Sequence, residues 1–453
     1  MVHRSAEEIG TTAAGPRPLP PLGSQRTLRA PSAVDTVLDN GLRVIAVPRP
    51  AVPMVELRMA IPFGGTDHTH PARAEVLAAT LLCGTPRRDR FEIDTVLAAV
   101  GGDLAAGVDP EHLSISGSAL ATGLNTLLDV LGDVLTSASY PDDEVSRERS
   151  RLVERITMSR SQPRIIAREA LQRRRYGDHP ATRELPEADD VAAVAPAAVR
   201  ELHRESVVPR GAVLVMVGDV EPADAVQAVA CALQDWRSDR SATELPPLPE
   251  LTGADLLLVH RPGAVQSQLR LSAQAVPRSD ERYPAMQLAN LIFGGYFSSR
   301  WVENIRENKG YTYSARSGLE FNPYGATLLA EADAASGVTA AALLETRYEL
   351  GRIALVPPED SEVDNARQYA IGSHTISLSS QSGLAGQLTT LAVLGLDLDW
   401  LRAYPGRLQA VTTSQVAEVA AEFLAPARFT GVVVGDAERL AGPLAALGGV
   451  ELP

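Results

Sequence analysis

The second half of this chain repeats the first, and that duplication limits the folds that the sequence can adopt. Residues 193–219 align with residues 410–436 at a constant offset of 217 positions, without a gap. Each copy predicts a helix, a proline break and an apolar strand that ends in Gly-Asp. Two further pairs of segments align in the same order at offsets of 212 and 211: 47–60 with 259–272, and 77–84 with 288–295. Near-constant offsets indicate that one fold is used twice.

Each half combines strands of alternating hydrophobicity with long amphipathic helices. In the first half we predict strands at 42–48, 53–62, 103–108, 112–119 and 212–218, and helices at 72–83, 91–100, 122–138 and 142–160. Asp142 and Asp143 favour the start of the last of these helices. The third and fourth strands are separated by a short turn, which implies antiparallel pairing. The predicted fold class is α+β, with two duplicated halves, each a largely antiparallel sheet packed with helices.

Two stretches rich in proline separate the halves from each other and from the N-terminus. The sequence ELPPLPEL at 244–251 is typical of a semi-extended linker. The first residues are rich in proline and glycine and predict a disordered tail. These features divide the chain into a tail at 1–30, an N-terminal domain at 31–243, a linker at 244–252 and a C-terminal domain at 253–453.

Composition excludes several classes of protein. Hydrophobic residues make up 45% and charged residues 22% of the chain, as in ordinary globular proteins, and no apolar run is long enough to span a membrane. The start of the chain lacks the apolar region of a signal peptide. Two cysteines argue against a disulfide framework, which favours the cytoplasm. A net charge of −14 argues against a nucleic-acid partner. The single lysine, Lys309, in an arginine- and alanine-rich chain suggests a GC-rich, bacterial genome.

The order of the motifs resembles the pitrilysin–insulinase–mitochondrial processing peptidase family of inverzincin metallopeptidases. The resemblance covers roughly residues 35 to 440 and rests on LDNGLRVIAVPRP, CGTPRR, VGGDLAAGVDPEHLSISGSAL, RERSRLVERITMSRSQP and IRENKGYTYSARSGLE. It implies that the two halves form one side of a clam-shell chamber in which peptides are cleaved. Catalytic members carry His-x-x-Glu-His on the helix before Gly-Thr, and a distant glutamate completes their zinc site.

The positions that correspond to the zinc motif have lost it. Two histidines at i and i+4 share one helix face and bind one zinc ion, whose bound water the glutamate deprotonates. When the motif is aligned on Gly-Thr, the two histidine positions are Glu75 and Ala79, and the general-base position is Ala78. The distant ligand position falls on Arg155, whose charge would repel a cation. We therefore expect no metal in this chain, and the helix is retained as scaffold. The Asn-Ala that the family carries at its substrate edge is Ala105-Ala106 here.

Two histidines ahead of this helix offer a relocated metal site as an alternative. On a strand, His68 and His70 would face the same way. The competing interpretation is that they are solvent-exposed loop residues, which the scattered positions of the other histidines favour. Glu111 and His112 likewise fit the rim of a hairpin.

The second half keeps a motif that the first half lacks. The segment 293–317 predicts a glycine turn, a helix capped by Ser298 or Ser299 and ending at Gly310, and then a strand. The resemblance implies that Arg306 and Tyr313 form an arginine–tyrosine pair that faces the chamber. Their donors suit substrate carbonyls or a developing oxyanion, so we assign them a catalytic role in trans. Lys309 and Tyr311 are predicted to contact substrate. The alternative is that Tyr311 and Tyr313 share one strand face and only pack against the helix.

The resemblance further implies two-chain assemblies in which zinc and the arginine–tyrosine pair lie on different subunits. The leading hypothesis is a non-catalytic, substrate-binding subunit of a heterodimeric zinc metalloendopeptidase. It would be inactive alone, with zinc on a homologous partner chain and a peptide held by strand addition to a sheet edge. The alternative is a homodimeric peptide-binding or scaffold protein without protease activity.

Overall fold

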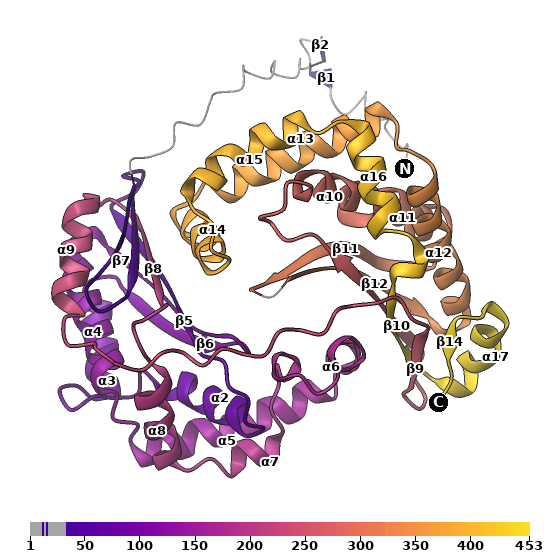
Figure 1. Cartoon of the computed structure of the whole chain (residues 1–453). Coiled ribbons are helices and arrows are strands. Elements are labelled where there is room, and N and C mark those ends of the chain that lie inside the picture. Colours follow the sequence, from indigo (N-terminus) through magenta and orange to yellow (C-terminus); the bar gives the residue numbers. More distant parts are fainter. Residues whose placement is uncertain (1–10, 13–14, 17–32, 324) are drawn as a thin grey trace. The chain divides into compact units, whose positions relative to one another are not determined.

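The computed structural model describes residues 11–12, 15–16, 33–323 and 325–453 (Figure 1). The tail expected at 1–30 lies outside the described residues, except for two short paired strands, β1 (Thr11–Thr12) and β2 (Gly15–Pro16). The remainder forms one compact unit that contains two mixed six-stranded sheets. No helix in the described part of the chain is long and apolar enough to cross a membrane.

The first sheet has the strand order β3-β4-β8-β5-β7-β6, and all but one of its pairings are antiparallel. Its strands are β3 (Val34–Val37), β4 (Arg43–Pro48), β5 (Met54–Pro62), β6 (Asp103–Val108), β7 (His112–Leu120) and β8 (Val213–Gly218). The helices of this half are α2 (His70–Thr80), α3 (Arg90–Ala99), α4 (Leu124–Ser137), α5 (Asp142–Arg160), α6 (Pro163–Tyr176), α7 (Ala188–Ala192), α8 (Pro196–Ser206) and α9 (Pro222–Ala232). The strands and helices predicted in this half are present within a few residues of their expected ends.

The second sheet has the order β11-β12-β10-β13-β9-β14. Its strands are β9 (Leu256–His260), β10 (Gln266–Ala275), β11 (Thr312–Asn322), β12 (Gly325–Ala335), β13 (Thr430–Gly435) and β14 (Val450–Glu451). The helices are α10 (Tyr283–Asn290), the π-helical η3 (Leu291–Gly295), α11 (Arg300–Val302), the π-helical η4 (Glu303–Asn308), α12 (Thr339–Leu355), α13 (Asp360–Ser377), α14 (Gln381–Val393), α15 (Leu398–Ala410), α16 (Thr413–Phe423) and α17 (Ala437–Leu447). Four short 3₁₀ turns complete the described structure: Ala121–Gly123, Pro180–Thr182, Ser336–Val338 and Pro426–Arg428.

The two sheets share one topology, which agrees with the duplication. Strands β4, β8, β5, β7 and β6 of the first sheet correspond in order to β9, β13, β10, β12 and β11 of the second. The correspondence extends to side chains. Arg58 donates to the carbonyl oxygen of Leu57 at 2.7 Å, and Arg270, its counterpart 212 positions later, donates to that of Leu269 at 2.8 Å. The prediction of an α+β fold with two duplicated, largely antiparallel halves is confirmed.

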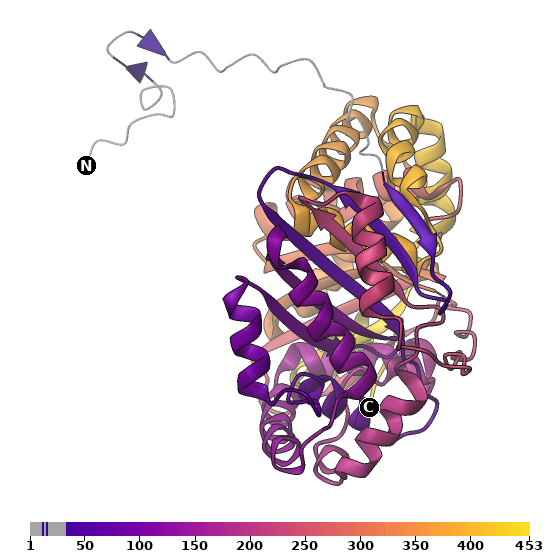
Figure 2. The same cartoon turned by 90° about the vertical axis from the view of Figure 1, so that its left-hand side faces the viewer.

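A helix from each half packs on the sheet of the other half. Helix α14 contacts β5 and β8 of the first sheet, and α6 contacts β10 and β13 of the second. These helices pack on buried valines at matching positions of the repeat. Val215 and Val217 cluster with residues of α14, and Val432 and Val434 cluster with residues of α6. Helices α4 and α9 lie on the other side of the first sheet, the side turned to the viewer in Figure 2.

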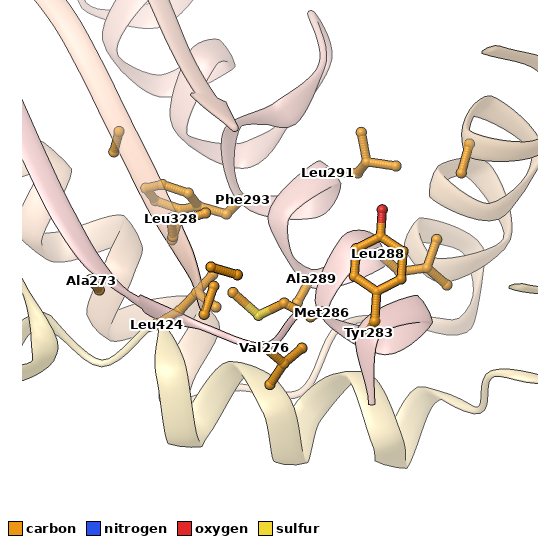
Figure 3. Packing of buried hydrophobic residues seen from close by; sticks show 14 of the residues in the cluster. Ala273, Val276, Tyr283, Met286, Leu288, Ala289, Leu291, Phe293, Leu328 and Leu424 are labelled. Atoms are coloured by element: carbon orange, nitrogen blue, oxygen red, sulfur yellow. The ribbon is translucent and has the colours of Figure 1, made fainter. Parts of the chain in front are cut away.

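The largest apolar cluster lies mainly in the second half and extends to β4 and β8 of the first sheet. Phe293, Leu328 and Met286 are essentially inaccessible and come from three separate elements, and Leu424, directly after α16, packs with them (Figure 3). Residues 237–255 between α9 and β9 carry no helix or strand. Leu245 and Leu251 of this segment are nevertheless buried. The domain boundaries at 243/244 and 252/253 stay a prediction.

Arg175 of α6 joins the two halves through polar contacts. Arg175 is 8% exposed, and its guanidinium donates to the hydroxyls of Ser272 and Thr327 and to the carboxylate of Glu320 at 2.7 Å. Removing it leaves the Ser272 hydroxyl and the Glu320 carboxylate without their charged partner in a partly buried site, while Thr327 still donates to Glu320. We therefore expect Arg175→Ala to lower the free energy of unfolding by about 2 kcal/mol. Urea unfolding measures this, and the exposed Arg164→Ala on the same helix is expected to change it by less than about 0.5 kcal/mol.

Candidate functional site

Helix α2 carries three of the four positions that correspond to a zinc motif. It begins after Thr69, with Pro71 in its first turn, and packs against α5. Ala78 faces the core, whereas Glu75 and Ala79 lie on a half-buried face. The fourth position, Arg155 on α5, is close enough that its positive charge acts on Glu75. Burial raises the pKa of the Glu75 carboxyl, and Arg155 partly offsets that effect. The structure thus brings the two halves of the motif together across 80 positions of sequence.

The side chains at this place do not fit a zinc ion. Zinc in proteins takes three or four nitrogen, sulfur or oxygen ligands in tetrahedral geometry. Here the set offers one carboxylate, two methyl groups and a guanidinium. The guanidinium is a permanent cation that occupies the position of a ligand. These four positions can support the local packing of α2 on α5 but cannot hold or activate a metal.

The expectation that His68 and His70 share a strand face is wrong. The turn around Asp67, whose carboxylate accepts from the Thr69 backbone at 2.8 Å, leads directly into α2. His70 is therefore the first residue of a helix and points inward. Its Nε2 lies 2.8 Å from the Phe63 carbonyl oxygen, and burial lowers its pKa. His68 remains exposed. The competing interpretation of two exposed loop histidines is also wrong for His70.

Two other groups of potential ligands occur in the described part of the chain, both in the first half. Glu144 and Glu148 lie beside Cys83, but both carboxylates already pair with Arg90, at 3.1 and 3.0 Å. The second group is Asp109, Glu111 and His112 at the β6–β7 hairpin. There the Asp109 carboxylate accepts from the backbone of the other two residues, so the predicted hairpin rim is present.

Glu111 makes the stability of this hairpin depend on pH. Burial raises the pKa of its carboxyl to about 7, against the attraction of His112 and with the repulsion of Asp109. Between pH 4.5 and 7 the folded state therefore holds a proton that the unfolded state has lost, so this group lowers stability as the pH rises through that window. We expect Glu111→Gln to raise the free energy of unfolding by about 1 kcal/mol at pH 8 and to leave it unchanged at pH 4. Urea unfolding at both pH values tests this, with the exposed Glu154→Gln as a control that changes neither.

In the second half, the segment before Arg306 is helical where a glycine turn was expected. Helix α10 continues without a break into the π-helix η3, and η4 is a second π-helix that carries Arg306. Gly294 sits in η3 because a Cβ there would lie 2.8 Å from the Trp301 ring. Ser299 occupies the cap position of α11, but its buried hydroxyl makes no hydrogen bond in the described structure, so the predicted side-chain cap is wrong. Gly310 has φ +63° and ends the segment as predicted.

The structure brings Arg306 and Tyr313 together, and adds Phe297. The guanidinium carbon lies 5.4 Å from the centre of the Tyr313 ring and 4.4 Å from that of Phe297. Both rings are exposed, at 88% and 60%. Stacking on aromatic faces orders a guanidinium while leaving its N–H groups free to donate. Glu307 is its one ion-pair partner in the described structure, at 3.4 Å. The signal for Phe297 in the sequence was an aromatic residue among small ones, FGGYFSS.

A β-bulge gives Tyr313 its exposure. Thr312 pairs with Ala334 and Ser314 with the adjacent Asp333, so Tyr313 has no partner in the ladder. The Thr312 hydroxyl donates to the Asp333 carbonyl oxygen and thereby holds the bulge. A bulge turns one side chain away from the regular alternation of a strand. The expectation that Tyr311 and Tyr313 share a strand face is therefore wrong.

The two predicted substrate contacts lie elsewhere. Tyr311 precedes β11 and packs, half-buried, against the core of the second half. Lys309 pairs with Glu345 of α12 at 3.4 Å and lines a groove between η4 and α12. Their roles in substrate binding stay predictions.

Each of the two sheets ends in an edge strand that carries one of the predicted positions. Strand β11, which carries Tyr313, is the edge of the second sheet in the described structure, and β6, which carries Ala105 and Ala106, is the edge of the first. An unpaired edge offers backbone donors and acceptors to an added strand.

Comparison with known proteins matches both halves to one family. Residues 74–189 match the family described as Insulinase (Peptidase family M16), and residues 193–369 match the Peptidase M16 inactive domain. The chain belongs to the M16 peptidase family. The inverzincin resemblance is thus confirmed, and this M16 chain lacks the catalytic motif. The Arg306 and Tyr313 pair lies within the match to the inactive domain.

Relatives and solved structures agree with this assignment. An uncharacterized zinc protease of Streptomyces coelicolor is 26% identical over 330 residues, which cover 70% of this chain and 71% of the relative. One of Mycobacterium leprae is 26% identical over 301 residues, or 65% and 68% of the two chains. The crystal structure of a peptidase M16 inactive domain from Pseudomonas fluorescens superposes with a TM-score of 0.81 at 22% identity and covers 89% of this chain and 98% of that one. This last likeness supports the fold.

Proposed function

We propose that this M16 chain is the non-catalytic, substrate-binding subunit of a two-chain zinc metalloendopeptidase. It would be inactive alone and would pair with a homologous chain that carries the His-x-x-Glu-His motif and the zinc. One observation carries the proposal: the Arg306–Tyr313 pair is assembled and exposed, whereas the four zinc-motif positions hold no usable ligand set. In a chain that acts without a partner, an arginine–tyrosine pair would have no zinc site beside which to act.

The chemistry of each residue supports a division of roles. The N–H groups of Arg306 can donate hydrogen bonds to a carbonyl oxygen or an oxyanion, and the Tyr313 hydroxyl can donate another. Phe297 would position the guanidinium. Strand β11 would hold an extended peptide substrate by backbone pairing, which is only weakly selective for sequence.

The test measures zinc content and peptide cleavage for this chain alone, and then for its mixture with a zinc-bearing M16 homologue. We expect no zinc and no cleavage alone, and a mixture that cleaves faster than the homologue does by itself. Stoichiometric zinc in this chain alone would contradict our interpretation of α2 and α5. A stable homodimer that binds peptide and never increases the homologue's rate would favour the alternative, a homodimeric peptide-binding or scaffold protein.

A further inference from the structure

A second cavity lies in the second half, and neither Arg306 nor Tyr313 lines it. It has a volume of about 220 Å³ and lies among α10, α13, α14, α15 and the loop before α10. An engineered cavity of about 150 Å³ holds benzene, so this one has room for a single ring with a short polar group. Its walls combine aromatic rings with uncharged polar side chains, and its lining contains no acidic residue.

Three rings form the aromatic wall. Trp400 and Tyr404 stack with ring centres 4.8 Å apart, and Tyr283 lies 5.6 Å from Tyr404 and 6.0 Å from Trp400. Tyr283 sits at the start of α10, and its hydroxyl points away from Val276 and Leu424 of the core (Figure 3). Stacked rings of this kind present flat apolar faces that suit an aromatic guest.

Arg278 supplies the charge. Its guanidinium lies 4.6 Å from the ring centre of Phe321 and 6.0 Å from that of Trp400, and it makes no ion pair with any described residue. Its Nε is buried and has no hydrogen-bond partner in the described structure. Arg278 is half-buried and its guanidinium faces aromatic rings, so a bound carboxylate would supply an ion pair that no described residue provides.

A second unsatisfied group lies beside it. His374 packs edge-on against Tyr404 at 5.3 Å, and its buried Nε2 has no hydrogen-bond partner in the described part of the chain. Burial lowers the pKa of His374, against a hydrogen bond of the ring with the Leu401 backbone, so the neutral ring leaves Nε2 free to donate or accept. The polar side chains of Gln287, Gln387 and Ser373 also line the cavity.

From this geometry we propose that the cavity binds a small carboxylate that carries one aromatic ring. The ring would stack on the Tyr283–Trp400–Tyr404 wall, and the carboxylate would pair with Arg278. The ligand is either a free aromatic acid or the C-terminal residue of a peptide, since both present the same two groups. This site is separate from Arg306 and Tyr313, and it does not depend on a partner subunit.

The test titrates the full chain with N-acetylphenylalanine and with its amide by calorimetry. A charge-assisted hydrogen bond is lost in the amide, so we expect the acid to bind at least about 10-fold more tightly. Arg278→Gln should weaken binding of the acid by about 10-fold or more, whereas Arg282→Gln, which removes a nearby arginine already paired with Asp280 and Glu422, should not. Ser373→Phe, a change at an exposed position of the lining, should block the cavity and abolish binding without unfolding the chain.

Each outcome either supports or overturns the proposed site, or identifies the source of its ligand. Equal binding of acid and amide, unchanged binding in both Arg278→Gln and Ser373→Phe, or no binding up to about 5 mM would each overturn it. A longer peptide that ends in phenylalanine separates the two sources. If it competes with N-acetylphenylalanine, the site takes peptide C-termini, and if it does not, the site takes free aromatic acids.

Discussion

Replacing Arg306 by alanine is expected to lower kcat/KM of the reconstituted two-chain peptidase about 100-fold. Removing one preorganised hydrogen-bond donor to a developing oxyanion costs about that much in other enzymes. Tyr313→Phe removes a single hydroxyl and should cost about 10-fold. Phe297→Ala should cost only about 2- to 5-fold, since it removes one stacking surface and leaves the donor in place.

The measurement is the initial rate of cleavage of a fluorogenic peptide by the mixture, at a fixed concentration of the zinc-bearing chain. Arg439→Ala is the matched control, because this exposed arginine on α17 pairs with Asp436 and lies outside the site. Affinity between the two chains is measured in parallel. A rate that Arg306→Ala leaves unchanged, in a pair that still forms, would show that the assigned role is wrong.

Replacing Trp301 by alanine is expected to lower the free energy of unfolding by about 3–5 kcal/mol, the usual cost of truncating a buried aromatic residue. Trp301 is 1% exposed, its ring stacks on Phe293 at 5.2 Å, and its Nε1 donates to Thr346 at 3.0 Å. The loss would leave a cavity under η3, while the Thr346 hydroxyl would keep its hydrogen bond to the Ala342 carbonyl oxygen. Since α11 leads into η4, the variant should also disorder Arg306.

Urea unfolding of the isolated chain measures this effect. Trp301→Phe keeps most of the stacking and is expected to cost about half as much or less. Leu355→Ala, at a side chain that is 83% exposed, should change the free energy by less than about 0.5 kcal/mol. Should Trp301→Ala unfold at the same urea concentration as the unchanged chain, the stack would contribute little and the proposed support for η4 would be wrong.

Local patterns in the sequence were sufficient to predict most of the helices and strands of the first half. The period of hydrophobic residues and the turn residues located α5 at Asp142–Arg160, and β4 and β6 within one residue of their ends. The repeat predicted that both halves share one topology. These features depend on neighbours in the sequence, which is why they could be read without the structure. Two π-helices escaped prediction, because the same residues would also form an ordinary helix or a glycine turn.

The candidate site was predictable in its residues and not in its geometry. The family resemblance identified Glu75, Ala78, Ala79 and Arg155 as the zinc-motif positions. It also implied the pairing of Arg306 with Tyr313. The bulge that exposes Tyr313 depends on the register between β11 and β12, and the role of Phe297 depends on the fold of the turn before it. Neither the bulge nor the position of Phe297 can be predicted from residue types alone.

By itself, the sequence determined that one fold is used twice and that the zinc ligands are missing, because residue identity and spacing carry both facts. Tertiary structure alone decided which side chains meet. It placed α6 and α14 on each other's sheets, stacked Arg306 between two exposed rings, and left Arg278 without a carboxylate in an aromatic cavity. Those results come from contacts between segments far apart in the chain, whose partners are chosen by the packing of the whole unit.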